Sequence, residues 1–150
     1  MELLISLKKC ICQGYVRWYN HSIIGVNILN KIAPLFEKVI EYNRQGSLEY
    51  VYNNLAIEKK DLLWVAWEKD NIDNILMVVI TRLVEGNVME ILACGGQQRN
   101  LWMDYFSTLE QFAKDHGCTR IQIKNGRKGW QRDLSKQGMK VTGYTFEKNI

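Results

Sequence analysis

Two adjacent glycines, Gly95 and Gly96, stand between an apolar run and a long amphipathic segment of the chain. If a strand ends at these glycines and a helix begins just after them, free backbone N–H groups and the positive end of the helix dipole meet at one tip. Such a tip can bind a phosphate or another anion. A backbone N–H near Cys94 to Gly96 could also donate to a developing oxyanion. A simpler interpretation is a strand that ends at a tight turn, and the sequence leaves both open.

Two side chains are candidates for proton transfer. Glu90 lies among apolar neighbours and could act as a general base if burial raises its proton affinity, or it could face solvent on an alternating strand. Tyr144 could act as a general acid toward a leaving thiolate, or it could pack in the core. Cys94 is not a candidate nucleophile, because no histidine lies near it in the sequence to activate it.

A polar segment after residue 124 could also bind a ligand. Arg127 could hold a phosphate with its planar guanidinium group, Trp130 could cover a ligand, and Asn125 lies close by in the sequence. The competing interpretation, which we favour, pairs Arg127 with Glu110 and uses Trp130 to anchor a short helix on the core.

The same stretch is basic, with Lys124, Arg127, Lys128 and Arg132 close together. We expect a solvated face here and no nucleic-acid partner, because neither a glycine-aromatic RNA signature nor a recognition-helix pattern accompanies the charges. A metal site is not expected either, since the four cysteines and two histidines of the chain lack the spacing of zinc ligands.

Three apolar runs precede the glycine pair, at residues 62–67, 75–83 and 88–94, with turn residues at 69–71 and 85–87 between them. This pattern predicts an antiparallel three-stranded meander. The central run is apolar at every position from 75 to 80, which is typical of a strand covered by helices on both faces.

The segment after the glycines has the clearest helical pattern, with an apolar stripe from Leu101 to Phe112 and a stop at Gly117. A helix at 128–137 and a last strand at 141–146 are predicted further on.

A strand at 119–124 lies between these helices in the sequence. The crossover helix makes this strand a parallel neighbour of the strand at 88–94. We expect the two strands to diverge near Gly95 and Asn125 and to leave a wedge-shaped cleft.

Length and composition fit a single domain over residues 1–150, with 47% apolar residues, 24% charged residues and a net charge of +4. Helical patterns, one of them with Ser47 as a cap, predict an N-terminal helical part at 1–58, and the sheet and cleft part follows at 62–148. No apolar stretch approaches the roughly 20 residues of a membrane span. No signal-peptide pattern is present at the N-terminus, so we expect reduced cysteines and a cytoplasmic protein without membrane contact.

The order of these elements, with Gly95-Gly96 leading into the long helix and Gly117-Cys118 into the next strand, resembles the GNAT acyltransferase fold. The second half is most similar to small GNAT-like proteins of tailed bacteriophages. That similarity rests on Gly95-Gly96, Glu110, Ala113, Gly117-Cys118, Gly126-Arg127-Lys128-Gly129-Trp130, Leu134 and Gly138. It implies an α/β (α+β) fold with a mixed, mainly antiparallel sheet, one splayed parallel strand pair and helices on both faces.

The resemblance further implies an acyl-CoA-dependent N-acyltransferase, which moves an acetyl group from acetyl-CoA, or another acyl group, to an amine acceptor. In that family the pantetheine arm lies between the splayed strands, and the pyrophosphate meets the N–H groups after an Arg/Gln-x-x-Gly-x-Gly/Ala turn. The candidate catalytic residues are Glu90 and Tyr144. The candidate cofactor-binding residues are Cys94, Gly95, Gly96, Gln98, Arg99, Asn100, Leu101, Asn125, Arg127 and Trp130.

The turn in this chain departs from the family pattern, because it reads Gly95-Gly96-Gln97-Gln98-Arg99-Asn100, with no glycine after Gln98. Side chains at 98–101 would crowd a pyrophosphate that approaches the backbone. The alternative function is therefore a catalytically inactive phage protein of the same fold, which acts as an internal virion or host-interaction protein. Such a protein would be found in the host cytoplasm or in the virion.

Overall fold

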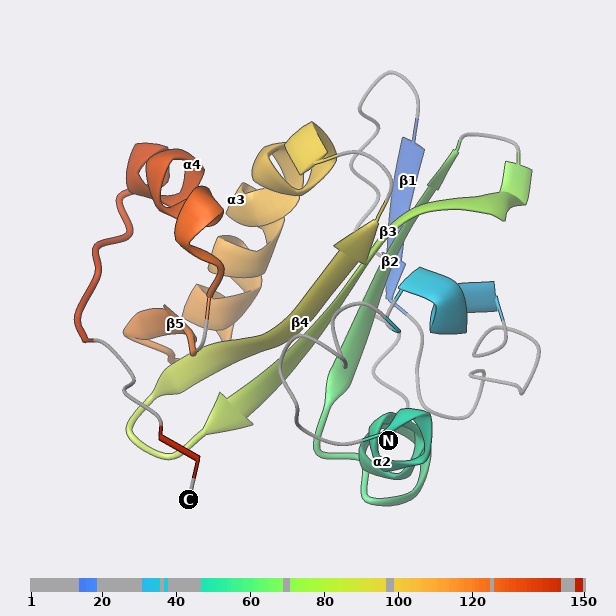
Figure 1. Cartoon of the computed structure of the whole chain (residues 1–150), viewed down its shortest axis with the longest axis horizontal. Helices are drawn as coiled ribbons and strands as arrows, with labels where there is room; N and C mark the ends of the chain where they lie inside the picture. Colours follow the sequence, from blue (N-terminus) through green and yellow to red (C-terminus); the bar gives the residue numbers. More distant parts are fainter. Residues whose placement is uncertain are drawn as a thin grey trace.

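The computed structural model describes residues 14–18, 31–35, 37, 47–68, 71–96, 99–124, 126–143 and 148–149. Within these residues one five-stranded sheet runs in the order β1-β2-β3-β4-β5 (Figure 1). The strands are β1 (Gly14–Trp18), β2 (Leu62–Glu68), β3 (Asn71–Val84), β4 (Val88–Gly96) and β5 (Arg120–Ile123). The helices are α2 (Leu48–Tyr52), the π-helix η1 (Asn53–Ile57), α3 (Arg99–Asp115), the 3₁₀-helix η2 (Lys128–Trp130) and α4 (Gln131–Lys136), and residues 31–35 are helical as well.

The pairing of the strands confirms a mixed, mainly antiparallel sheet. Strands β1 to β4 pair antiparallel with their neighbours, and β4 pairs parallel with β5. A three-residue turn joins β3 to β4, in which Gly86 and Asn87 adopt the left-handed conformation with φ of 80° and 57°. Glycine and asparagine tolerate this conformation best. Strand β3 begins at Asn71, earlier than the predicted strand at 75–83, because Asn71 pairs with Glu68.

The parallel pair is short and its strands part at one end. Pairing runs from Val88 opposite Arg120 to Ile91 opposite Ile123, and helix α3 makes the crossover between the strands. Strand β4 continues for five residues beyond Ile91, whereas β5 ends at Ile123. The predicted parallel pair is therefore confirmed. The divergence near Gly95 and Asn125 and the wedge-shaped cleft stay predictions, because pairing stops where β5 ends and Asn125 lies outside the described residues. We call the region beyond this last pair, where β4 continues without pairing to β5, the fork.

A β-bulge in β4 lies where the fork begins. Thr81 of β3 pairs with Ile91, but Ile80 pairs with Ala93, so Leu92 is the extra residue. A bulge bends its strand and increases its twist. It also reverses the alternation of side chains, so that Cys94 rather than Ala93 packs on the same face as Ile91. The bend therefore lies directly after the last residue of β4 that pairs with β5.

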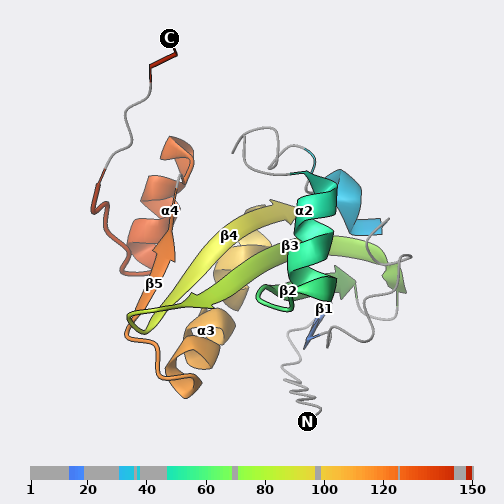
Figure 2. The ribbon, with the colours of Figure 1, turned by 90° about the horizontal axis from the view of Figure 1, so that it is seen from below.

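Both faces of the sheet are covered by helices, as predicted from the continuous apolar run in β3 (Figure 2). Helix α3 covers one face, and residues 31–35 with α2 and η1 lie on the other. The core on the α3 face consists of Trp64, Ala66, Met77, Val79, Met89, Ile91, Tyr105, Phe106, Leu109, Phe112 and Ala113. The core on the opposite face consists of Ile32, Leu55, Leu63, Val65, Ile75, Val78 and Ile80. Each helix layer therefore buries its own apolar stripe against one face.

The N-terminal part differs from the prediction. Residues 1–58 are predicted to be helical. Helix α2 confirms one of the predicted helices, together with its cap Ser47, whose Oγ accepts a hydrogen bond from the Tyr50 N–H at 3.2 Å. However, β1 also lies in this part and extends the sheet by pairing with Trp64–Glu68 of β2. The helical description of 1–58 is therefore wrong at residues 14–18.

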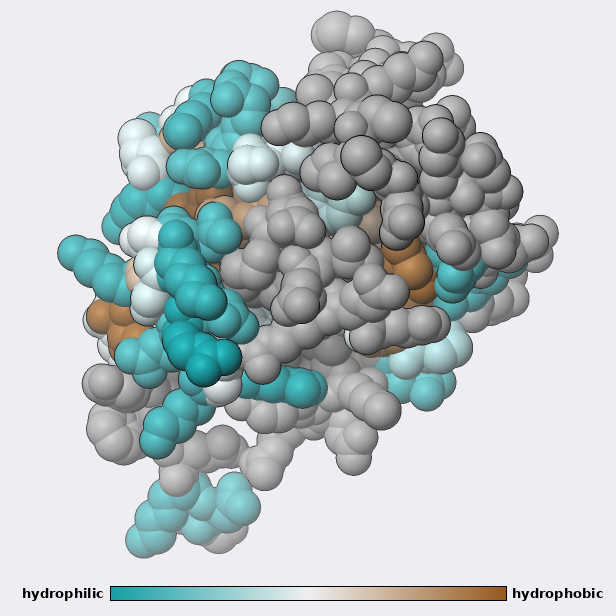
Figure 3. Space-filling model, turned by 90° about the horizontal axis from the view of Figure 1, so that it is seen from above, coloured by the Kyte–Doolittle hydropathy of each residue, from teal (hydrophilic) through white to brown (hydrophobic). Residues whose placement is uncertain are grey.

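The C-terminal part agrees with the prediction up to residue 138. The helix predicted at 128–137 is present as η2 followed by α4, and Gly138 ends it with φ of 77°. The outer surface at this end of the molecule is mostly hydrophilic (Figure 3). The predicted last strand at 141–146 is not confirmed, because Val141–Gly143 belong to no strand and residues 144–146 lie outside the described residues.

Candidate functional site

The fork places a strand end close to the start of a long helix. Residues 92–96 of β4 extend past the end of β5, and α3 begins at Arg99, three residues after Gly96. The first N–H groups of a helix have no partner within the helix. The first turn of α3 and the positive end of its dipole therefore follow closely after the end of β4, and the binding of an anion there stays a prediction. Gln98 and Asn125 lie outside the described residues, as do the side chains of Arg99, Asn100 and Leu101, so their roles remain predictions.

The structure gives Gly95 and Gly96 a packing role. Both lie within β4 and pair with Val78 and Met77, and neither has a positive φ. A Cβ on Gly95 would overlap the carbonyl oxygen of Leu35, and a Cβ on Gly96 would lie 2.5 Å from the carbonyl oxygen of Leu76. Glycine is therefore needed at both positions so that backbones can approach closely. Strand β4 does end at Gly96, but residues 97 and 98 lie outside the described residues, so the tight turn stays a prediction. The glycines alone are no evidence for a ligand.

This close approach predicts that Gly95→Ala lowers the free energy of unfolding by about 1 to 3 kcal/mol, the usual cost of overpacking. Urea denaturation measures the change. Gly129→Ala is the matched control, because a Cβ there meets no atom within 4 Å, and its effect should stay within about 0.5 kcal/mol. Equal effects of the two substitutions would show that Leu35 does not pack against β4 in this way.

Glu90 lies at the closed end of the fork. Its side chain is buried, so the interpretation in which it faces solvent is wrong, and its carboxylate pairs with the Lys124 ammonium. Lys124 follows the last residue of β5, so this ion pair joins the two strands at the point where they part. Glu90 lies five residues before Gly95, roughly 16 Å along β4. A ligand that reaches both must therefore be extended.

Cys94 lies on the α3 face of β4 and is half-buried against the core. Burial raises the pKa of its thiol from 9.0 to about 12. The thiol therefore stays protonated at neutral pH, which agrees with the expectation that Cys94 is not a nucleophile.

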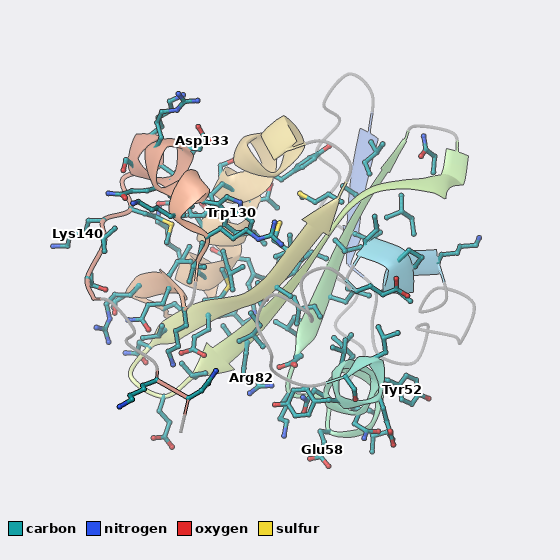
Figure 4. All side chains as sticks on the ribbon, in the orientation of Figure 1. Tyr52, Glu58, Arg82, Trp130, Asp133 and Lys140 are labelled. Atoms are coloured by element: carbon teal, nitrogen blue, oxygen red, sulfur yellow. The ribbon has the colours of Figure 1, made fainter. Side chains whose placement is uncertain are left out.

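Trp130 packs against the core on the α3 face together with Leu134, as in the interpretation that anchors the short helix (Figure 4). Arg127 is exposed where η2 begins. The predicted pair of Arg127 with Glu110 is wrong, because Glu110 faces solvent and its carboxylate lies 3.3 Å from Lys114 Nζ on the next turn of α3. Tyr144 lies outside the described residues, so its role as a general acid stays a prediction.

Sequence reasoning missed a buried ion pair on the face opposite α3. Arg82 of β3 donates through Nε to Asp61 Oδ1 at 2.5 Å, and Asp61 is buried just before β2. The hydrogen bond to Asp61 raises the pKa of the Arg82 guanidinium. Arg82 is also directly opposite Glu90 across β3 and β4. The signal that could have revealed this pair is the single charge of Arg82 in the otherwise apolar run of β3, since a charge there needs a partner.

Two negative findings concern the part of the chain that the structure describes. No group of three or more His, Cys, Asp or Glu side chains could hold a metal ion there. None of its helices has both the length and the apolar character of a membrane span.

No protein-family model matches the chain, and no curated protein matches it significantly. Solved structures match it over most of their length. An aminoglycoside acetyltransferase from an uncultured soil metagenomic sample, solved with trehalose, has a TM-score of 0.65 and 12% identity, over 91% of this chain and 96% of that one. A tetramutant of the BH1408 protein from Bacillus halodurans has a TM-score of 0.68 and 13% identity, over 90% of this chain and 99% of that one. Ribosomal-protein-alanine N-acetyltransferase from Brucella melitensis biovar Abortus 2308 has a TM-score of 0.62 and 10% identity, over 91% of this chain and 99% of that one.

At such low identity these matches show the fold alone. The chain has the fold of GNAT acetyltransferases, as the resemblance in its sequence implies. The finer similarity to phage proteins is untested and stays a prediction.

Proposed function

We propose that the chain is an acyl-CoA-dependent N-acyltransferase, which transfers an acetyl group from acetyl-CoA to an amine. The observation that carries this proposal is the fork between β4 and β5, with α3 beginning at its open end. Structures with the same fold include acetyltransferases of aminoglycosides and of a ribosomal protein, so an amine acceptor fits the fold in general terms.

The fork offers backbone groups to an extended ligand. Beyond Ile91, β4 no longer pairs with β5, so its backbone N–H and C=O groups on that side can pair with amides of a ligand, as in the addition of a strand to a sheet edge. In our proposal the pantetheine arm lies along the part of β4 beyond Ile91. The N–H groups in the first turn of α3, together with Arg99, bind the pyrophosphate.

The chemistry needs few protein groups. The acceptor nitrogen forms a bond to the thioester carbonyl carbon and gives up a proton, the carbon–sulfur bond breaks, and the departing thiolate is protonated to the thiol. We assign the N–H groups near Cys94 to Gly96 to the developing oxyanion. Glu90, which lies roughly 16 Å from Gly95 along β4, takes the proton of the acceptor ammonium group through a chain of water molecules, and Tyr144 gives a proton to the thiolate.

Calorimetry and thermal melting with acetyl-CoA test the proposal. We expect saturable heat and a raised melting temperature at about 1 mM ligand, because a ligand that binds only the native state stabilises it by mass action. Arg99→Ala should weaken binding by about 10- to 150-fold, which corresponds to the loss of a charge-assisted hydrogen bond. Lys114→Ala, at the far end of α3, is the matched control and should bind like the wild type.

Gly96 is unsuitable for this test, because any side chain there approaches the Leu76 carbonyl oxygen and disturbs the sheet itself. A wild-type protein that gives neither heat nor a melting shift with acetyl-CoA would overturn the enzymatic proposal.

The competing proposal is a protein that keeps the fold without the reaction and acts as a virion or host-interaction protein. Two observations favour it: the turn has no glycine after Gln98, and close packing accounts for Gly95 and Gly96 without a ligand. It predicts the negative outcome of the acetyl-CoA titration.

A further inference from the structure

Positive charge is concentrated in one part of the chain. Residues 118–143 contain seven arginines and lysines against one acidic residue, Asp133, a net charge of +6, whereas the remaining residues sum to −2. This part forms β5, η2 and α4, which lie together at one end of the molecule (Figures 1 and 2). We call its cationic residues the basic edge: Arg120, Lys124, Arg127, Lys128, Arg132, Lys136 and Lys140.

Every cation of the basic edge is exposed. Lys128, Arg132 and Lys136 follow one another at intervals of four residues and form a row along the chain. Arg132 and Lys136 both lie in α4, where residues four apart have about 5 to 6 Å between their Cβ atoms. Lys140 extends the row and points away from the sheet (Figure 4). Asp133 lies 3.9 Å from Arg132 and 3.8 Å from Lys136, and Glu90 pairs with Lys124. These two carboxylates offset two of the seven positive charges of the basic edge.

The basic edge lacks the centre of a protein-binding surface. Stable protein interfaces are organised around buried aromatic and apolar anchors. Trp130 and Leu134 pack inward against the core on the α3 face. Among the described residues, the exposed large apolar side chains other than Val141 lie elsewhere, on α2, η1 and β3. A partner that needs charge but no apolar contact therefore fits this surface best.

We propose that the basic edge binds the phosphate backbone of nucleic acid without reading its sequence. Regularly spaced phosphates match a row of exposed cations, and backbone contacts need only charge and hydrogen bonds. The sequence predicts a solvated face here because it lacks a base-reading motif, but binding that is independent of sequence needs no such motif. This inference does not depend on the proposed acyl transfer, and its test contains no acyl-CoA.

Fluorescence anisotropy with labelled duplex DNA and single-stranded RNA of mixed sequence tests the proposal. If about four cations contact phosphates, the logarithm of the association constant should fall with the logarithm of salt concentration with a slope of about −4 for the duplex. Affinity should then drop about 10²-fold between 50 and 200 mM salt. The RNA probe shows whether single strands bind as well as the duplex.

The triple variant Lys128→Gln/Arg132→Gln/Lys136→Gln should reduce the magnitude of this slope by about 3, roughly one for each lost contact. The matched control, Lys31→Gln/Lys59→Gln/Lys60→Gln, removes three charges from outside the basic edge and reaches the same net charge. It should keep the slope of the wild type, and melting curves check that both variants fold.

Two results would overturn the proposal: no binding to either nucleic acid at 50 mM salt, or equal losses in the two triple variants. The first result can be accompanied by binding to polyglutamate. That combination would assign the basic edge to an acidic protein partner instead.

Discussion

Replacing Arg82 with methionine is expected to lower the free energy of unfolding by about 3 kcal/mol, as observed when one partner of a buried ion pair is removed. The Asp61 side chain is 5% exposed and loses the Arg82 guanidinium as its partner in the variant. We expect the low end of the usual range, because 24% of the Arg82 side chain reaches solvent and water can partly replace it. Urea denaturation at pH 7 measures the loss.

Two controls separate this effect from a general loss of charge. Lys136→Met removes a cation from an exposed pair with Asp133 and should change the free energy of unfolding by no more than about 0.5 kcal/mol. The double variant Asp61→Leu/Arg82→Met should recover most of the loss, since apolar replacement of both partners is often neutral. An Arg82→Met variant as stable as Lys136→Met would mean that solvent reaches Asp61 and that the pair contributes little.

The ion pair of Asp61 and Arg82 has a counterpart on the same face of the sheet. The first pair links the start of β2 to β3, and Glu90 with Lys124 links β4 to the end of β5. Arg82 and Glu90 face each other across the two middle strands. Charged contacts therefore cross the sheet at the closed end of the fork, while backbone pairing between β4 and β5 is absent at its open end.

The elements that position the fork could be predicted because their signals are local. Tyr105, Leu109 and Phe112 recur at helical spacing and are buried in α3. The parallel pairing of β4 with β5 follows from the crossover helix between them, because a helix of that length returns the chain in the same direction. Neither inference needs information from distant parts of the sequence.

Two features of the fold have no local signal. Strand β1 is only five residues long and contains a glycine and an arginine, and its partner β2 lies more than 40 residues later in the chain. The bulge at Leu92 depends on the register with β3, and nothing in the composition of β4 marks it. Both depend on pairing between separate strands, which a single sequence does not reveal.

The site shows the same limit at the level of single residues. Glu110 is adjacent to Leu109, which suggested a place near the apolar stripe, but one residue along a helix is a rotation of about 100°. That rotation turns Glu110 to solvent, where it meets Lys114. The role of Gly95 depends on the carbonyl oxygen of Leu35, 60 residues earlier, so the sequence around Gly95 could not distinguish a turn, a ligand site and close packing.

Alkylation of Cys94 in the folded protein at pH 8 is expected to be about 10³-fold slower than that of an ordinary cysteine. Burial raises the pKa of this thiol from 9.0 to about 12, and only the thiolate reacts. Three pKa units reduce the thiolate fraction at pH 8 about 10³-fold. Iodoacetamide labelling followed by peptide mass spectrometry measures the rate at Cys94 alone.

The variant Ser135→Cys provides an exposed thiol in the same folded chain, and labelling in urea provides Cys94 itself without burial. Both should react at ordinary rates.

Because the unfolded thiol ionises near pH 9 and the folded one near pH 12, Cys94 should also make the free energy of unfolding fall by about 1.4 kcal/mol per pH unit between these values. Cys94→Ala should lack this contribution. Labelling of Cys94 as fast as of Ser135→Cys would mean that its thiolate forms readily, and Cys94 would then become a candidate nucleophile at the fork.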